Sequence, residues 1–243
     1  VSRETAQELW TFKTGHGVWA APLYVHAREG DEHGRDTLYA VSLDHHLYAI
    51  DPDTGDELWK KNLGGAAPGN MVYDEQLNRL YIGTLTSELL AIDLDQRAIL
   101  DRYDTEGWLW GSPALEVQED GTEILYLGDL KGYLYAVEVT EGGFSQRWKM
   151  KVAEDAIRAT PLLTDGKVIV GSKDKKVYAV SKEDGSSEWN DSTKGEALTE
   201  LVLVPGADSE QNGGVVVLGT SESEERIVAY NVETGEVDWR YSD

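Results

Sequence analysis

Short runs of apolar and aromatic residues recur along the chain, and the clearest pattern is the stretch 47–59, Leu-Tyr-Ala-Ile-Asp-Pro-Asp-Thr-Gly-Asp-Glu-Leu-Trp. Its first residues predict a strand buried on both faces, because aromatic and β-branched side chains suit a pleated sheet. Residues 51–55 predict a tight turn, since proline presets one backbone angle and glycine accepts positive φ. The chain then returns to Trp59 as a second strand. The stretch is therefore a hairpin whose indole is expected to cover a neighbouring layer.

This hairpin is repeated five times. Each copy is marked by an alanine in its first strand, and the alanines are Ala49, Ala91, Ala136, Ala179 and Ala229. The distances between consecutive alanines are 42, 45, 43 and 50 residues. Four copies return to a tryptophan, namely Trp59, Trp148, Trp189 and Trp239, and in the second copy Leu100 is assigned to this place. Periods of this length are typical of four-stranded propeller blades.

Two further apolar runs precede each hairpin, so every unit is predicted to contain four strands. The fold class is accordingly all-β, a β-propeller of four-stranded antiparallel blades in a single domain over 1–243. The five units are predicted at 17–63, 64–107, 108–153, 154–195 and 196–243. An extra fourth strand is predicted at 4–13, so either five blades close with a surplus strand or the chain forms part of a larger ring. The charged or polar segments 28–36, 205–214 and 221–225 predict exposed loops.

The recurring pattern Ser/Thr-Pro, then Val-x-x-Gly-Ser, then Leu-Tyr-Ala-x-Asp-x-x-Thr-Gly-x-x-x-Trp resembles the propeller repeat of the pyrroloquinoline-quinone (PQQ)-binding-like superfamily. The resemblance extends over nearly the whole chain. The copy at 49–59 fits at every marked position, whereas Gln96-Arg97 replaces Thr-Gly in the second copy. Quinoprotein alcohol dehydrogenases and many non-enzymatic proteins share this repeat. The resemblance therefore implies the fold more specifically than the function.

Composition narrows the range of partners. The chain has 45 acidic and 22 basic residues and a formal net charge of −23, which argues against nucleic acids and anionic membrane surfaces as partners. It has no cysteine, so disulfides and thiolate metal sites are excluded. No apolar run has membrane-spanning length, and the chain is interpreted as a mature or excised soluble piece. The resemblance implies an extracytoplasmic location, periplasmic or secreted.

The candidate binding site is the channel face, where the segments leading into each first strand meet the loops between second and third strands. Alignment of the units on their prolines places Trp19, Trp110 and Arg158 at equivalent positions. Two indoles and a guanidinium around one cavity could hold a flat anionic or aromatic ligand by stacking and charge pairing. The alternative is that these side chains fill the channel or pack against the neighbouring blade.

Three histidines belong to the same face. His16 precedes a first strand, and His45 and His46 lie between the second and third strands of that unit. Imidazoles are common metal ligands, but no carboxylate or fourth histidine stands at ligand spacing beside them. The interpretation is therefore ordinary loop histidines that contribute to ligand binding, without a metal site.

An enzymatic role demands more than this sequence offers. PQQ enzymes of the resembled family form eight-bladed rings and bind calcium through acidic and amide side chains, often with a vicinal cysteine pair above the quinone. This chain has five units, no cysteine and no matching set of ligands. The favoured function is a non-catalytic module that presents a rigid surface or axial pocket to a protein, a peptide or a small ligand. The alternative is a fragment of a PQQ-dependent dehydrogenase, and only this alternative requires PQQ and calcium.

Overall fold

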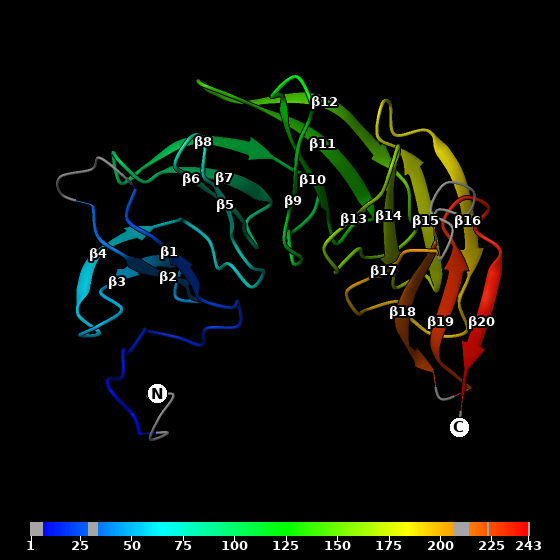
Figure 1. The fold of residues 1–243 in the computed structure, drawn as a ribbon, viewed down its shortest axis with the longest axis horizontal. Helices are drawn as coiled ribbons and strands as arrows, with labels where there is room; N and C mark the ends of the chain where they lie inside the picture. Colours follow the sequence, from blue (N-terminus) through cyan, green and yellow to red (C-terminus); the bar gives the residue numbers. More distant parts are fainter. Residues whose placement is uncertain (1–6, 29–33, 207–213, 223, 243) are drawn as a thin grey trace.

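The structure is a computed structural model that describes residues 7–28, 34–206, 214–222 and 224–242. Its strands form five four-stranded antiparallel sheets, each built from four strands that are consecutive in the chain. The sheets follow one another along an arc, with the first strands on its inner side and the fourth strands on its outer side (Figure 1). No helix capable of spanning a membrane occurs in the described residues. The predicted all-β propeller fold is confirmed.

The strands of each sheet lie within one of the units defined by the repeat. The first sheet contains β1 (Leu23–Val25), β2 (Thr37–Val41), β3 (His46–Ile50) and β4 (Glu57–Asn62). The second contains β5 (Val72–Asp74), β6 (Arg79–Gly83), β7 (Glu88–Asp93) and β8 (Ala98–Asp104). The third contains β9 (Ala114–Val117), β10 (Glu123–Gly128), β11 (Tyr133–Thr140) and β12 (Gly143–Lys151). The fourth contains β13 (Leu162–Leu163), β14 (Lys167–Ser172), β15 (Lys176–Ser181) and β16 (Ser187–Ser192). The fifth contains β17 (Val202–Val204), β18 (Val215–Glu222), β19 (Glu225–Asn231) and β20 (Val237–Tyr241).

The middle two strands of each sheet carry the core. Strands such as β6 and β10 are buried along their whole length because each lies between two neighbouring sheets. The apolar clusters are accordingly shared between consecutive sheets: one joins sheets one and two, and others join two with three, three with four, and four with five. Stability therefore depends on the seams, by which we mean the interfaces between consecutive sheets.

At two seams a tryptophan of one sheet seals the hairpin turn of the next. The Trp148 Nε1–H donates to the Lys182 carbonyl at 2.8 Å, and the Trp189 Nε1–H donates to the Val232 carbonyl at 2.9 Å. Each indole lies against the glycine of that turn, Gly185 or Gly235, where a Cβ would come within 3.0 Å of ring atoms. The glycines have φ of 73°, which side chains disfavour, so the turn needs glycine for both shape and space.

The seam between the second and third sheets uses a different set of contacts. The strand register pairs Ala91 with Asp101, just as it pairs Ala49 with Trp59, so Asp101 and not Leu100 occupies the tryptophan place. The Asp101 carboxylate accepts a hydrogen bond from the Phe144 N–H at 2.8 Å in the third sheet. The assignment of Leu100 was wrong by one residue, because Leu100 lies at the bulge of its hairpin and drops out of the register.

The two ends of the arc differ. Residues 7–13 form no strand, which departs from the extra fourth strand predicted at 4–13, and residues 4–6 lie outside the described part. The Trp10 indole nevertheless donates to the Pro52 carbonyl at 2.9 Å and covers Gly55, as Trp148 does for the turn of its own neighbour. At the other end Trp239 is 41% exposed. The hairpin turn of the first sheet is thus covered by the side chain of a residue that belongs to no strand. In the fifth sheet, the face that carries Trp239 is left open to solvent.

One loop prediction is wrong in part. The segment 221–225 is predicted to be an exposed loop, and Ser221 and Glu224 are exposed. However, β18 extends to Glu222 and β19 begins at Glu225, which is fully buried. The Glu225 carboxylate accepts a hydrogen bond from the Lys194 N–H at 2.7 Å and also pairs with Arg240. These partners compensate the cost of burying the charge. Most of the loops predicted at 28–36 and 205–214 lies outside the described residues.

Candidate functional site

Five equivalent segments build the inner rim of the arc. In each, the carbonyl oxygen of the first residue accepts a hydrogen bond from a backbone N–H of its own sheet, which lies in the loop between the second and third strands or, in the fifth sheet, near the end of the second strand. The pairs, donor first, are Leu43 with Gly17, Leu85 with Ala66, Leu130 with Trp108, Lys173 with Ala156, and Ser221 with Glu196. Because the same bond recurs at 2.8–3.1 Å, the residues two positions later are equivalent. They are Trp19, Pro68, Trp110, Arg158 and Leu198.

Three of these equivalent side chains form a ladder across the rim. The Trp19 and Trp110 rings lie with their centroids 5.5 Å apart, and the Arg158 guanidinium lies 5.0 Å from the Trp110 ring centroid. Trp19 therefore reaches past Pro68 of the intervening unit to contact Trp110. Trp19 is 61% exposed, so the ladder presents an aromatic face to solvent. We call Trp19, Trp110 and Arg158 the rim ladder.

Close backbone packing brings the ladder together. A Cβ on Gly69 would approach the Gly111 carbonyl oxygen to 2.7 Å, and a Cβ on Gly111 would approach the Arg158 carbonyl oxygen to 2.6 Å. Both distances are shorter than a real Cβ contact, so glycine is required at each point. The inner edges of the second, third and fourth units can therefore approach one another, which places Arg158 over Trp110.

The rim ladder has unused binding capacity. The Arg158 Nε is buried without a hydrogen-bond partner, and its guanidinium makes no hydrogen bond or ion pair with the residues that the structure describes. A guanidinium stacked on an indole can still donate in its own plane to a carboxylate. The ladder can thus accept an acidic group beside an apolar or aromatic one, which is binding chemistry and not catalysis.

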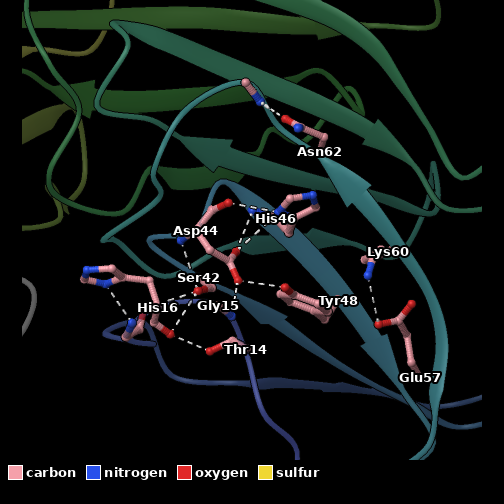
Figure 2. Close-up of polar contacts among 12 residues, drawn as sticks. Thr14, Gly15, His16, Ser42, Asp44, His46, Tyr48, Glu57, Lys60 and Asn62 are labelled. Atoms are coloured by element: carbon pink, nitrogen blue, oxygen red, sulfur yellow. Dashed lines mark hydrogen bonds and ion pairs between the residues drawn. The ribbon is translucent and has the colours of Figure 1, made fainter.

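Of the three histidines, His16 directly precedes the first unit, His45 lies in the turn between β2 and β3, and His46 is the first residue of β3. The His16 Nδ1 accepts a hydrogen bond from the Gly17 N–H at 2.8 Å, and the His46 Nδ1 lies 2.9 Å from the Asp44 carbonyl oxygen. Figure 2 shows the His16 and His46 rings on opposite sides of Asp44. His45 has φ of 73° at the tip of the turn. In the described part of the chain no three His, Asp or Glu side chains are grouped to hold a metal ion.

Asp44 organises the loop that carries these histidines. Its carboxylate accepts hydrogen bonds from the Gly15 N–H at 2.6 Å and the Tyr48 hydroxyl at 2.7 Å (Figure 2). Burial opposes ionisation of Asp44, but the bonds from Tyr48, Gly15 and His46 outweigh it and hold the pKa of this carboxyl below its usual range. Burial, together with Asp44, raises the pKa of Tyr48 to about 12. Asp44 therefore stays charged and fixes the entry to the rim.

The same acidic anchor recurs in other units and was missed in the sequence. The Asp129 carboxylate binds the Gly107 N–H, and the Asp174 carboxylate binds the Glu154 N–H. In the fifth unit the buried Glu225 carboxylate binds the Lys194 N–H in the same way. The signal was present, because Ser-x-Asp-x-x-x-Tyr occurs at 42–48 and again at 172–178. These acids position the rim segments and do not form a catalytic pair.

Trp108 is a further rim residue that sequence reasoning missed. It occupies the first position of its segment, where its carbonyl oxygen accepts a hydrogen bond from the Leu130 N–H at 2.9 Å, and its side chain is 55% exposed. The equivalent residue in the first unit is Gly17, so comparison of the units drew no attention to it. Val18 is also exposed on this face. Trp108 and Val18 are thus exposed apolar residues of the same rim segments that carry Trp110 and Trp19.

A cavity of about 910 Å³ lies elsewhere, at the seam between the first and second sheets. It is lined by loops at the opposite end of the strands from the rim, including Asp51, Asp95 and Arg97, and by none of the predicted site residues. The seam is open here because Arg97 replaces the turn glycine, and the structure gives Trp59 no bond to that turn. The cavity follows from an imperfect repeat.

The five four-stranded sheets define a β-propeller protein with PQQ-like repeats. The chain belongs to the family described as outer membrane protein assembly factor BamB, whose pattern matches residues 1–142 and 46–242. The two overlapping matches extend over nearly the whole chain, as expected for a repeated unit. The PQQ-like resemblance inferred from the sequence is thus confirmed.

Relatives and solved structures agree with this assignment. The chain is 28% identical over 146 residues to outer membrane protein assembly factor BamB of Escherichia coli (strain K12), covering 60% of this chain and 34% of that protein. It is 25% identical over 184 residues to the factor of the same name from Burkholderia pseudomallei (strain K96243), covering 68% and 44%. The crystal structure of BamB from Moraxella catarrhalis superposes with a TM-score of 0.69 at 16% identity, covering 96% of this chain and 64% of that chain, which shows a shared fold.

Proposed function

We propose that this chain is a non-catalytic propeller module that binds a protein partner through the rim ladder and acts outside the cytoplasm. The observation that carries this proposal is the exposed Trp19–Trp110–Arg158 contact, whose guanidinium makes no pair within the described residues. Tryptophan and arginine are enriched among the few residues that supply most of the binding energy of protein interfaces. A rigid scaffold of stacked sheets holds them in place without a partner.

The comparisons support a role in the same process as the relatives. The matched relatives carry the name outer membrane protein assembly factor, and the chain spans 34% of one and 44% of another. We infer that the partner is a protein of outer membrane assembly and that the chain faces the periplasm. The high negative charge of the chain supports a protein partner over a lipid surface or a nucleic acid.

The chemistry of the rim ladder suggests what the partner offers. The indole faces of Trp19 and Trp110 suit apolar or aromatic side chains, and the Arg158 guanidinium suits a carboxylate. An acidic residue flanked by apolar residues on an extended segment or loop fits this arrangement. His16, His45 and His46 lie beside the first rim segment and the loop that Asp44 organises, and they would add polar contacts at the edge of the interface.

A fragment of a PQQ-dependent dehydrogenase fits the residues less well. Such an enzyme holds calcium with several acidic and amide side chains, whereas the described residues contain no grouping of three acidic or histidine side chains. The acids nearest the rim are already bonded to backbone N–H groups, as Asp44 and Asp174 are. The relatives named as assembly factors also favour a binding module.

Crosslinking in the cell tests the proposed function. A photoreactive amino acid at Trp108, exposed on the rim face, should crosslink to a protein of the outer membrane assembly machinery that mass spectrometry identifies. The matched probe at Val117, exposed at the opposite end of its sheet, should not form this product. Equal products from both probes, or a product from Val117 alone, would contradict binding at the rim.

Charge reversal at the ladder should abolish the interaction. We expect Arg158→Glu to weaken the Trp108 crosslink at least about tenfold, because loss of an interface centre costs about 2 kcal/mol or more and reversal adds repulsion. The matched control is Arg147→Glu, since Arg147 is an exposed arginine of β12, outside the rim segments. The yield of crosslinked product on a gel measures both. An unchanged yield with Arg158→Glu would exclude the ladder as the contact.

A further inference from the structure

A buried acid pair lies at the seam between the second and third sheets, away from the rim ladder. Asp74 is the last residue of β5, and Glu123 is the first residue of β10. Their exposed fractions are 2% and 5%. Carboxylates buried to this extent are rare unless they are paired, so the pair requires a physical account.

The two carboxyl groups differ in their hydrogen bonds. Asp74 is well satisfied, because its Oδ1 accepts from the Leu77 N–H at 3.0 Å and its Oδ2 accepts from the Tyr81 hydroxyl at 2.9 Å. Both carboxyl oxygens of Glu123 are buried without any hydrogen-bond partner. A buried ionised carboxylate without a donor is costly, whereas a protonated one carries its own donor.

One arginine lies close to the pair, but it is used elsewhere. The two terminal nitrogens of Arg79 donate to the carbonyl oxygens of Thr140 and Glu141, each at 2.7 Å, in the hairpin turn of the third sheet. Its Nε has no partner. The single positive charge of Arg79 can balance one carboxylate of the pair. A second negative charge at this seam would remain unbalanced.

The surroundings of Glu123 favour its neutral form. Burial, followed by the proximity and negative charge of the Asp74 carboxyl, raises the pKa of Glu123 to about 7, although Arg79 opposes the shift. The charged or titratable groups facing Glu123 are Asp74, Arg79 and Tyr81 of the second sheet. Its partners on the adjacent strands are Val117 and Val139, which contribute no charge.

We propose that Asp74 and Glu123 together hold one proton, which locks the seam between the second and third sheets and is released when the pH rises above neutrality. The proton supplies the donor that Glu123 lacks and leaves the pair with one negative charge, which Arg79 balances. On release, two buried carboxylates face each other across the seam. The seam then loosens between the unit that carries Trp110 and the preceding unit.

The sign of the pH dependence follows from proton binding. Because Glu123 binds its proton more tightly in the folded chain than the ordinary value of 4.5 allows, the folded state takes up the proton first as the pH falls. The stabilisation is fully present below about pH 4.5 and is lost as the pH rises through about 7. Replacing Glu123 by a side chain that never ionises should therefore raise the stability relative to wild type, and the difference should be greatest at alkaline pH.

The test compares Glu123→Gln with the matched variant Glu119→Gln, at an exposed glutamate of the neighbouring turn. The glutamine amide donates to Asp74 at every pH. Thermal unfolding followed by circular dichroism should therefore give a midpoint for Glu123→Gln that exceeds wild type by about 5 °C at about pH 8.5 and matches it at about pH 4.5. Glu119→Gln should follow wild type throughout. Parallel profiles for wild type and Glu123→Gln would overturn the proposal.

A second measurement needs no variant. Infrared difference spectra of wild type with carbon-13-labelled glutamate should show a protonated carboxyl band that shifts with the label and disappears near neutral pH. Absence of this band would overturn the shared proton even if Glu123→Gln failed to fold. If a bound metal cation replaced the proton at this site, sodium or potassium chloride would raise the midpoint of thermal unfolding at alkaline pH, and tetramethylammonium chloride would not. That result would also overturn the proposal.

Discussion

Trp189→Ala should destabilise the protein by about 3–5 kcal/mol, the cost of removing a buried aromatic side chain from a packed interface. The Trp189 indole is 9% exposed, lies with its ring centroid 6.3 Å from that of Tyr230, and donates to the Val232 carbonyl at 2.9 Å. Removing it opens a cavity at the seam between the fourth and fifth sheets and leaves that carbonyl without its donor. Urea unfolding followed by circular dichroism measures the loss.

Trp239→Ala is the matched control for this prediction. Trp239 occupies the same place in the fifth sheet, opposite Ala229, but is 41% exposed at the uncovered end of the arc. We expect a loss of about 1 kcal/mol or less, since little packing disappears. Trp189→Phe should cost about 1 kcal/mol, because it keeps most of the packing and loses the hydrogen bond. Equal losses for the two alanine variants would refute the role of tryptophan at the seams.

Gly185→Ala should be the second most damaging change. Gly185 has φ of 73°, and a Cβ there would lie 2.7 Å from Met150 Cγ and 2.8 Å from the Trp148 ring. The backbone conformation costs a side chain about 1–2 kcal/mol, and the forced displacement of the indole adds about 1–3 kcal/mol. The urea midpoint should fall accordingly.

Gly166→Ala separates the two causes. Gly166 has nearly the same φ, 74°, but a Cβ there would meet nothing within 4 Å. We expect it to lose only the backbone cost of about 1–2 kcal/mol. If Gly166→Ala were as harmful as Gly185→Ala, the contact with Trp148 would contribute nothing and the conformation alone would explain both. Hydrogen exchange in the 182–186 turn would show the displacement directly.

Much of the fold was predictable because it depends on local chemistry repeated five times. The Thr-Gly turn and the alternation around Ala49 specify a hairpin within a dozen residues, and the period specifies the blades. The second copy shows that spacing is a better guide than residue type. Similarity of residue type favours Leu100 for the tryptophan place, but three other copies have the tryptophan ten residues after the alanine, and this spacing selects Asp101. The strand register pairs Asp101 with Ala91.

The rim was predictable in part for the same reason. Comparison of the units identified Trp19, Trp110 and Arg158 as equivalent residues. It did not reveal that Trp19 extends past the second unit to contact Trp110, because this contact depends on the curvature of the arc. The burial of Glu225 was also missed. A run of serine and glutamate residues is usually solvated, and here long-range bonds to Lys194 and Arg240 reverse that expectation.

The covering of three hairpin turns by a preceding tryptophan gives the arc a direction. Trp148 and Trp189 each belong to one sheet and bond to the turn of the next sheet, and Trp10 bonds to the turn of the first sheet although no strand carries it. Each such contact joins only two consecutive sheets. A complete extra unit inserted between the fourth and fifth units would therefore supply both a turn for Trp189 and a tryptophan for the turn at Gly235. An insertion of the same length that starts in the middle of a unit would leave one tryptophan without a turn and one turn without a tryptophan.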